Sequence, residues 1–197
     1  MMEQQSLFGD LEPPPPPTDR IFFAIRPDAG AIAAIGALTA ELKARHGMRG
    51  RPIADAKLHA TLCNLGDFVG MPHAKVARAL EVAGMVADST APFVAGFDTA
   101  QTFINRARNR PFVLVGGDGV VGVNALYKSL ASAMLKAGLP ASPASYTPHI
   151  TLLYDDVTAA PHSVPLVKWT VRELVLLHSQ IGQNLPYKVL GRWPLQP

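Results

Sequence analysis

A four-residue pattern, His-x-Thr-Leu, occurs twice in this chain, at residues 59–62 and again at residues 149–152. In a β-strand, side chains two residues apart point to the same face, so each copy would place one imidazole and one hydroxyl together. The residue between them and the leucine would point to the opposite face, into a core. The repeat therefore predicts two similar strands, and a fold in which these strands meet would bring two histidines and two threonines to one cleft.

The apolar spacing elsewhere in the chain predicts an α+β protein. Helical spacing indicates three helices, one between Asp28 and Gly47, one from Pro72 onward and one at about residues 123–137. Strand-like stretches, bounded by turn residues, cover about residues 21–25, 57–65, 92–103, 111–115, 146–154, 170–179 and 187–193. This order does not alternate strictly between strand and helix. The glycine-rich stretch at 116–122 fits neither phosphate-binding loop pattern, so we interpret it as a turn and disfavour a doubly wound nucleotide-binding fold.

The composition favours one folded domain behind a separate tail. The chain has 197 residues, of which 48% are hydrophobic, enough for one sizeable core. Prolines fill positions 13 to 17, and their missing N–H groups favour a stiff polyproline II spacer over a helix or a strand. We therefore expect a flexible proline-rich tail over residues 1–18 and a single domain over residues 19–197.

The tail contains a short peptide that suggests one partner. Gln4, Leu7 and Phe8 fit the Q-x-x-L-F peptide with which bacterial DNA-maintenance proteins bind the replication sliding clamp. Such a peptide on a flexible arm is suited to docking. One hypothesis is therefore that recruitment through this peptide is the main role of the chain. The alternative is a disordered tail without a partner.

The charge and cysteine content narrow the class of protein further. The formal net charge of +3 permits an anionic partner and excludes a histone-like binder. The single cysteine, Cys63, excludes a disulfide framework, and we interpret it as a buried thiol rather than a nucleophile. No apolar stretch is long enough for a membrane span, and the acidic N-terminus does not resemble a secretory signal. We expect a cytoplasmic monomer that does not bind a membrane.

Two histidines and two threonines in one cleft suit the hydrolysis of a phosphodiester. One imidazole takes a proton from the attacking water and the other gives a proton to the leaving oxygen, and both can do so near neutral pH. Threonine hydroxyls donate hydrogen bonds to the non-bridging phosphate oxygens. No metal or cofactor is required by this scheme. Each pattern taken alone is also compatible with a half-buried strand whose histidine has a structural partner.

These residues resemble the 2H phosphoesterase family, and within it the bacterial RNA 2',3'-cyclic phosphodiesterases, also called 2'-5' RNA ligases. The similarity extends to RIFFAI at 20–25, LHATLCNLGDF at 58–68, YTPHITLLYD at 146–155, and VRELVLLHSQ and PYKVLGRWPL near the C-terminus. The resemblance implies a bilobal α+β fold, with two antiparallel sheets flanking a central cleft and helices on the outside.

The resemblance also implies residue roles. His59 and His149 would form the acid–base pair, and Thr61 and Thr151 would bind the phosphate. By analogy His149 would activate water and His59 would protonate the leaving oxygen. The implied activity is metal-independent opening of 2',3'-cyclic phosphates at RNA or nucleotide ends to 2'-phosphomonoesters, with reversible 2'-5' ligation. The alternative is a noncatalytic module that binds RNA or nucleotides in the same cleft.

The chain departs from the family pattern after its second motif. Family members often carry an arginine there, whereas this chain has Leu-Tyr-Asp-Asp at 153–156. Tyr154 could stack on a base or pack at the end of its strand. Arg106, Arg108 and Arg110 could bind RNA phosphates, or form a solvated basic loop.

Overall fold

The computed structural model describes residues 14–140 and 146–196. Gln4, Leu7 and Phe8 lie outside these ranges, so sliding-clamp docking stays a sequence-based prediction. Thr18, which we expected in the tail, precedes β1 and is hydrogen-bonded to the sheet. Its N–H donates to Phe68 O and its carbonyl accepts from Ile181 N, each at 2.8 Å.

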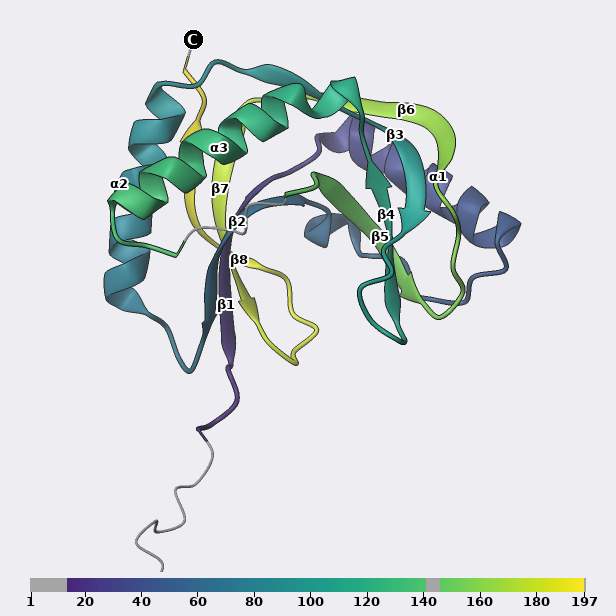
Figure 1. Ribbon diagram of the computed structural model, residues 1–197, viewed down its shortest axis with the longest axis horizontal. Coiled ribbons are helices and arrows are strands. Elements are labelled where there is room, and N and C mark those ends of the chain that lie inside the picture. The colour runs from purple at the N-terminus through teal and green to yellow at the C-terminus, as the bar shows by residue number, and fades with distance from the viewer. Residues whose placement is uncertain (1–13, 141–145, 197) are drawn as a thin grey trace, which may run out of the picture.

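The described residues form three α-helices, two short 3₁₀ helices and eight strands (Figure 1). The helices are α1 (Ala29–Arg45), η1 (Asp55–Lys57), α2 (His73–Asp88), η2 (Asp118–Val120) and α3 (Val121–Lys136). The strands are β1 (Asp19–Ile25), β2 (Ala60–Phe68), β3 (Phe93–Thr102), β4 (Arg110–Val115), β5 (His149–Asp155), β6 (His162–Val171), β7 (Glu173–Gln180) and β8 (Lys188–Pro194). The three predicted helices are confirmed, and Asp28 caps α1 by accepting from Ala31 N at 2.9 Å.

All eight strands belong to one antiparallel sheet with the order β6-β3-β4-β5-β2-β1-β7-β8. Its two halves, β6-β3-β4-β5 and β2-β1-β7-β8, meet between β5 and β2, where the register contains one residue pair, Ala60 with Ile150. In each half the strand at the junction follows a helix, as β1–α1–β2 and as β4–α3–β5. The two His-x-Thr-Leu copies therefore lie at equivalent places in two similar halves.

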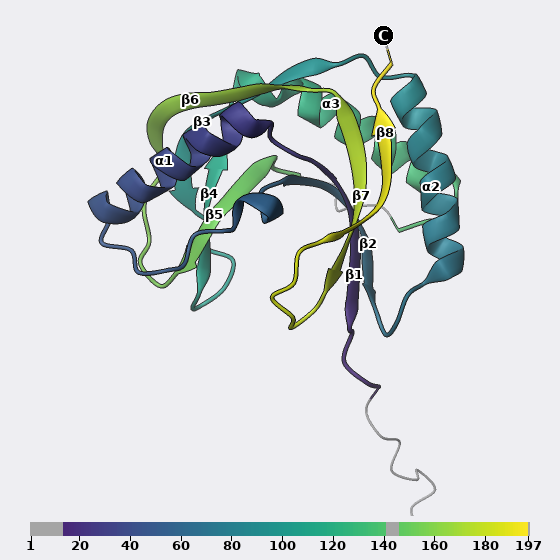
Figure 2. The same ribbon diagram turned by 180° about the vertical axis from the view of Figure 1, so that it is seen from behind.

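The expectation of two separate sheets is corrected by this junction. The bilobal character remains, because the halves form the two sides of an arch in Figures 1 and 2, but Ala60 and Ile150 join them into one sheet. The strand β6 was missed by the sequence analysis, which placed only one strand near residues 170–179. Pro165 lies inside β6, and the sheet accommodates it because β6 is an edge strand.

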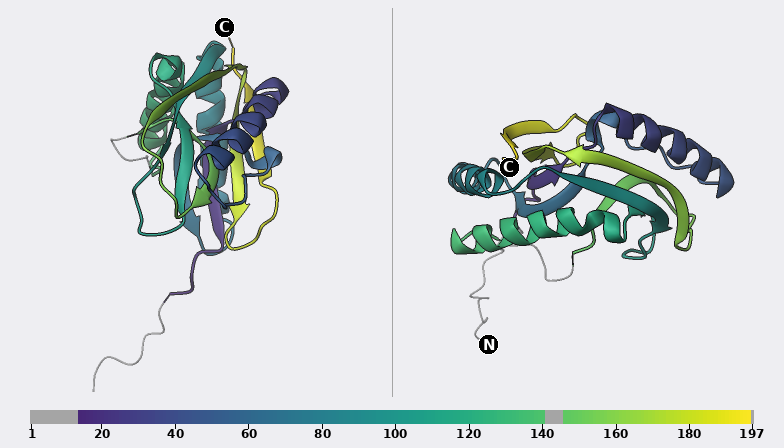
Figure 3. Two further views of the ribbon diagram at one scale, coloured as in Figure 1. Left: turned by 90° about the vertical axis from the view of Figure 1, so that its right-hand side faces the viewer. Right: turned by 90° about the horizontal axis from the view of Figure 1, so that it is seen from above.

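The helices lie around the outside of the strands (Figure 3). α2 packs against β7 and β8, α3 packs against α2, β2 and β3, and α1 packs against β6. One continuous core fills the space between helices and sheet, and it includes Phe23, Phe97 and Phe112, each at most 1% exposed. None of the helices in the described part of the chain is long and apolar enough to cross a membrane.

The glycine-rich stretch forms the expected turn, including η2. A Cβ on Gly116 would lie 2.3 Å from Gly96 O, and one on Gly119 would lie 2.6 Å from the same oxygen. Glycine at both positions therefore allows the turn to pack directly on β3. The stretch has a packing role in the fold and is not part of a phosphate loop.

Candidate active site

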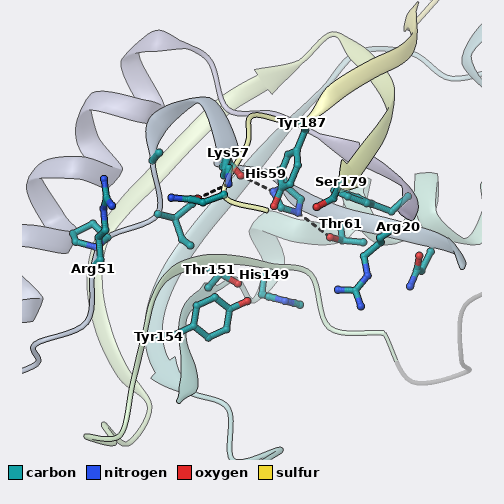
Figure 4. A pocket seen from close by; sticks show the side chains of 16 residues that line it. Arg20, Arg51, Lys57, His59, Thr61, His149, Thr151, Tyr154, Ser179 and Tyr187 are labelled. Carbon is teal, nitrogen blue, oxygen red and sulfur yellow. Dashed lines mark hydrogen bonds between the residues drawn. The ribbon is translucent and has the colours of Figure 1, made fainter. Parts of the chain in front are cut away.

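The junction between β2 and β5 positions both histidine–threonine pairs. Ala60 and Ile150 face each other across the junction and are fully buried, so the residues on either side of them point to the opposite face of the sheet. Because the strands are antiparallel, Thr61 lies on the side of His149, and His59 lies on the side of Thr151. A local twofold arrangement thus brings the four side chains to one cavity wall (Figure 4).

Both imidazoles are oriented by the same type of hydrogen bond. His59 Nδ1 lies 2.7 Å from Lys57 O, and His149 Nδ1 lies 2.8 Å from Thr147 O. A carbonyl oxygen can only accept, so Nδ1 carries the proton in each ring. In the neutral imidazole the lone pair is then on Nε2. Each histidine therefore presents Nε2 for proton transfer.

His59 lies among aromatic rings. Its ring centroid is 5.1 Å from that of Phe22 and 5.4 Å from that of Tyr187, which meets it edge-on. His59 Nε2 is 3.1 Å from Thr61 Oγ1, so in the neutral ring it accepts the threonine hydroxyl proton. Phe103 packs against His149 at a centroid distance of 5.0 Å.

The surroundings of His59 lower its pKa to about 4. The main cause is loss of hydration among its neighbours, and the nearby His149 and Arg26 lower the pKa further. The hydrogen bond to Lys57 O opposes this shift. In the free protein, His59 is thus neutral at pH 7, with its Nε2 lone pair available.

The cavity has a volume of about 530 Å³, and positively charged side chains line it. Its wall contains Arg20, Arg51 and Lys57 in addition to the two histidines, and among the described residues no carboxylate lines it. Phe22, Tyr154 and Tyr187 add aromatic surface, and the polar side chains are those of Thr61, Asn64, Thr151, Ser179 and Asn184. The arrangement is suited to an anion that carries a flat ring.

Of the residues that the sequence indicated, His59, His149, Thr61, Thr151 and Tyr154 line this cavity. Sequence reasoning missed the three permanent cations. Arg20 lies on β1, and its Nε and Nη2 donate to Asp67 at 2.7 and 2.6 Å. Lys57 Nζ donates to Asn184 Oδ1 at 2.8 Å. The available signal for Arg20 and Lys57 was their position at the start of a predicted strand, whereas Arg51 carried no local signal.

The basic stretch at 105–110, whose last residue begins β4, lies outside the cavity wall. Arg106 packs over the Tyr154 ring at 5.1 Å, Arg110 donates to Asp156 O at 3.1 Å, and Arg108 lies 3.9 Å from the Asp156 carboxylate. Contact of these arginines with RNA phosphates stays a prediction. In the structure, the ring contact of Arg106 and the hydrogen bond of Arg110 help to hold the loop.

Of the remaining histidines, one pairs with an aspartate, two lie next to each other, and His73 is exposed. His178 is buried, with Nε2 2.5 Å from Asp19 Oδ1, and His46 Nε2 lies 3.3 Å from His162 Nε2. Cys63 is fully buried, as expected. No three His, Cys, Asp or Glu side chains within residues 14–140 and 146–196 cluster as a metal site would need.

Comparison with known proteins gives one family. The family model described as the 2'-5' RNA ligase superfamily matches residues 26–183. No curated protein matches this sequence at a significant level.

Several solved structures share the fold. Escherichia coli LigT in apo form is 28% identical, with a TM-score of 0.70, over 93% of this chain and 100% of that one. LigT complexed with 3'-AMP is 29% identical, with a TM-score of 0.68, over 92% and 99%. A structure described as a phosphoesterase is 29% identical, with a TM-score of 0.69, over 92% and 99%. The protein TT0787 of Thermus thermophilus, at 24% identity, has the same fold, with a TM-score of 0.71, over 89% and 97%.

Proposed function

The chain belongs to the 2'-5' RNA ligase superfamily of 2H phosphoesterases, and on this premise we propose that it opens 2',3'-cyclic phosphates at RNA or nucleotide ends to 2'-phosphomonoesters without a metal. One observation carries the proposal. Two matched His–Thr pairs reach one cationic cavity, and each histidine is fixed so that Nε2 is the atom available for proton transfer. A binding site alone would not need two imidazoles oriented in the same way.

The reaction needs one proton acceptor and one proton donor. A neutral imidazole takes a proton from water, the water oxygen forms a bond to phosphorus, and the bond from phosphorus to O3' breaks as the other imidazolium protonates O3'. The product is a 2'-phosphomonoester with a free 3'-hydroxyl. If an RNA 5'-hydroxyl replaces water as the nucleophile, its oxygen forms the bond to phosphorus while the bond from phosphorus to O3' breaks and O3' is protonated, and the phosphodiester that remains on O2' is a 2'-5' linkage.

The lowered pKa of His59 supports one assignment of the two roles. A base must be neutral before the reaction, and His59, with a pKa of about 4, is neutral at pH 7 in the free protein. His59 is therefore the base in this scheme and His149 the acid. This assignment reverses the direction that the family analogy implied.

The threonines hold the phosphate. Thr61 Oγ1 lies 3.1 Å from His59 Nε2, so its hydroxyl would turn from the imidazole to a non-bridging phosphate oxygen when substrate binds. Thr151 occupies the matching place beside His149. Neutral hydroxyl donors bind the anion without adding charge to the cavity, where three permanent cations already lie. LigT complexed with 3'-AMP supports a ligand of nucleotide size.

The test is hydrolysis of adenosine 2',3'-cyclic phosphate in excess chelator, with phosphorus NMR to identify the product. We expect adenosine 2'-phosphate, and a loss of roughly 10²–10⁴-fold in kcat for His59→Ala and for His149→Ala. His73→Ala, at an exposed position at the start of α2, is the matched control. Activity that disappears on chelation would refute the two-histidine mechanism. Binding of the nucleotide without turnover would favour the noncatalytic module.

A further inference from the structure

Residues 49–53, between α1 and η1, are fixed along β5 next to the cavity. In the described structure, β2 pairs with β5 through one residue pair at the junction. Farther along β5, residues 49–53 lie where β2 would otherwise continue. Pro52 forms an antiparallel bridge with Leu153, and Ile53 N donates to Leu152 O at 2.7 Å. The segment is therefore held as an additional short strand.

The start of the segment is fixed by Asp155. The backbone N–H groups of Arg49 and Gly50 both donate to Asp155 Oδ2 at 2.6 Å. A Cβ on Gly50 would lie 2.0 Å from Tyr154 O, so only glycine allows this close approach. Since both ends of the segment are bonded to β5, the backbone of Arg51 is fixed before any ligand arrives.

The Arg51 side chain reaches the cavity wall from this segment. The antiparallel bridge places Arg51 across from Tyr154, which also lines the cavity. Figure 4 shows Arg51 and Arg20 at opposite ends of the cavity, with the two histidines between them. Arg51 therefore lies at a position separate from the one that we propose for the cyclic phosphate, between the histidines.

Arg51 differs from the other two cations in its partners. Arg20 is bound by the Asp67 carboxylate, and Lys57 is engaged by Asn184 and lies 5.7 Å from the Tyr187 ring centroid. Within the described part of the chain, Arg51 has no carboxylate at ion-pair distance. A guanidinium without an ion-pair partner, carried on a fixed backbone at the wall of a cavity without carboxylates, is suited to binding a phosphate.

We propose that Arg51 binds the 5'-phosphate of the terminal nucleotide, so that the cavity selects an RNA end over a cyclic mononucleotide. The inference rests on the proposed function, which places the cyclic phosphate between the histidines. A 2',3'-cyclic phosphate closes the 3' end of a strand, so the next phosphate of that strand is the one on the 5' oxygen of the same nucleoside.

The test uses three substrates that differ by one group at a time. These are adenosine 2',3'-cyclic phosphate, the same nucleotide with a 5'-phosphate, and the dinucleotide ApA with a terminal 2',3'-cyclic phosphate. We expect the 5'-phosphate to raise kcat/KM about tenfold, mainly through KM, which is the size of one charged hydrogen-bonded contact. Arg51→Gln is expected to remove this gain, measured within the variant as the ratio of kcat/KM for the 5'-phosphorylated nucleotide to kcat/KM for the cyclic mononucleotide, which should fall from about ten to about one.

Arg49→Gln is the matched control, because it removes the same charge two residues away, and Arg49 lines a different hollow with Asp155 and Asp156. It should keep the full gain from the 5'-phosphate. If the 5'-phosphate brings no gain, or if Arg49→Gln loses as much of it as Arg51→Gln, the role of Arg51 is refuted while the proposed function stands.

A binding measurement separates this inference from the proposed function. Calorimetry compares adenosine 2'-phosphate with adenosine 2',5'-bisphosphate, and it requires no turnover. Tighter binding of the bisphosphate by wild type, lost in Arg51→Gln but not in Arg49→Gln, would support the Arg51 subsite. This holds even if the protein hydrolyses no cyclic phosphate, because a lack of hydrolysis would overturn only the proposed function. Equal affinities for both nucleotides would overturn the subsite.

Discussion

His59 and His149 share the same orienting hydrogen bond, yet the chain gives them different surroundings. His59 lies between Phe22 and Tyr187, and loss of hydration there is the main reason for its pKa of about 4. His149 has one ring neighbour, Phe103. In the proposed mechanism, these different surroundings would let two equivalent groups act as a base and an acid in one site.

The lowered pKa of His59 predicts the pH dependence of the reaction. The profile of kcat/KM reports the ionisations of the free enzyme, so a neutral His59 acting as base keeps the reaction active down to about pH 4. If His59 were instead the acid, kcat/KM would fall as the pH rises above about 4, because His59 would lose the proton it must donate. Initial rates from about pH 4 to about pH 9 distinguish the two directions, and an NMR titration of His59 in the free protein measures its pKa directly.

At the scale of single residues, the sequence analysis was most informative where the relevant spacing is local. The two-residue period of a strand was enough to place His59 with Thr61, and His149 with Thr151, on shared faces. Arg51 could not be found in this way. It reaches the cavity because Pro52 bridges to Leu153, a contact between residues far apart in the chain that has no pattern in the local sequence.

Among the elements, the helices were predicted well and the sheet less so. α1 and α3 carry apolar residues at helical spacing, which their burial in the core explains. β6, which the sequence analysis missed, contains a proline that argues against a strand, and its place at the sheet edge makes that proline acceptable. The joining of the halves into one sheet depends on the pairing of Ala60 with Ile150. A single residue pair between two strands leaves no pattern in the sequence from which it could be predicted.

The element β2 is also tied to the segment before β5 by one side chain. Tyr146 Oη donates to Thr61 O at 2.7 Å, and the Tyr146 ring stacks on Tyr127 of α3 at a centroid distance of 4.0 Å. Burial raises the pKa of the Tyr146 hydroxyl, which keeps it protonated as a donor. Tyr146 is thus a positioning residue that fixes Thr61 relative to His149.

We expect Tyr146→Phe to keep the ring packing, to lose about 1 kcal/mol of unfolding free energy and to lower kcat more than it changes KM. The matched control is Thr39→Val, which removes a buried side chain–backbone hydrogen bond of the same length, 2.7 Å, inside α1. Urea unfolding and steady-state kinetics on both variants provide the comparison. Equal losses of stability with a lower kcat only in Tyr146→Phe support positioning, and an unchanged kcat in Tyr146→Phe would rule it out.

For the whole molecule, the question is whether the two halves fold as one unit. The single residue pair at the junction would be a weak link on its own. The core compensates, because one buried cluster includes Phe23 and Leu176 from one half together with Phe97 and Phe112 from the other. α3 contacts strands of both halves. A shared core makes separate unfolding of either half expose much of the other half's apolar surface.

The two tryptophans of the chain test this cooperativity, since each half contains one of them. Trp169 lies on β6 in one half and stacks on Phe97, whereas Trp193 lies on β8 in the other half and contacts Phe23. The variants Trp169→Phe and Trp193→Phe each leave one fluorescent probe. In each variant, we expect the urea midpoint from fluorescence to coincide with the midpoint from far-ultraviolet circular dichroism, because both halves lose structure in one transition. Comparing the two methods within one variant removes any difference in stability between variants. A fluorescence midpoint that departs from its own dichroism midpoint in either variant would mean that the halves unfold separately, and that Ala60 and Ile150 join two domains.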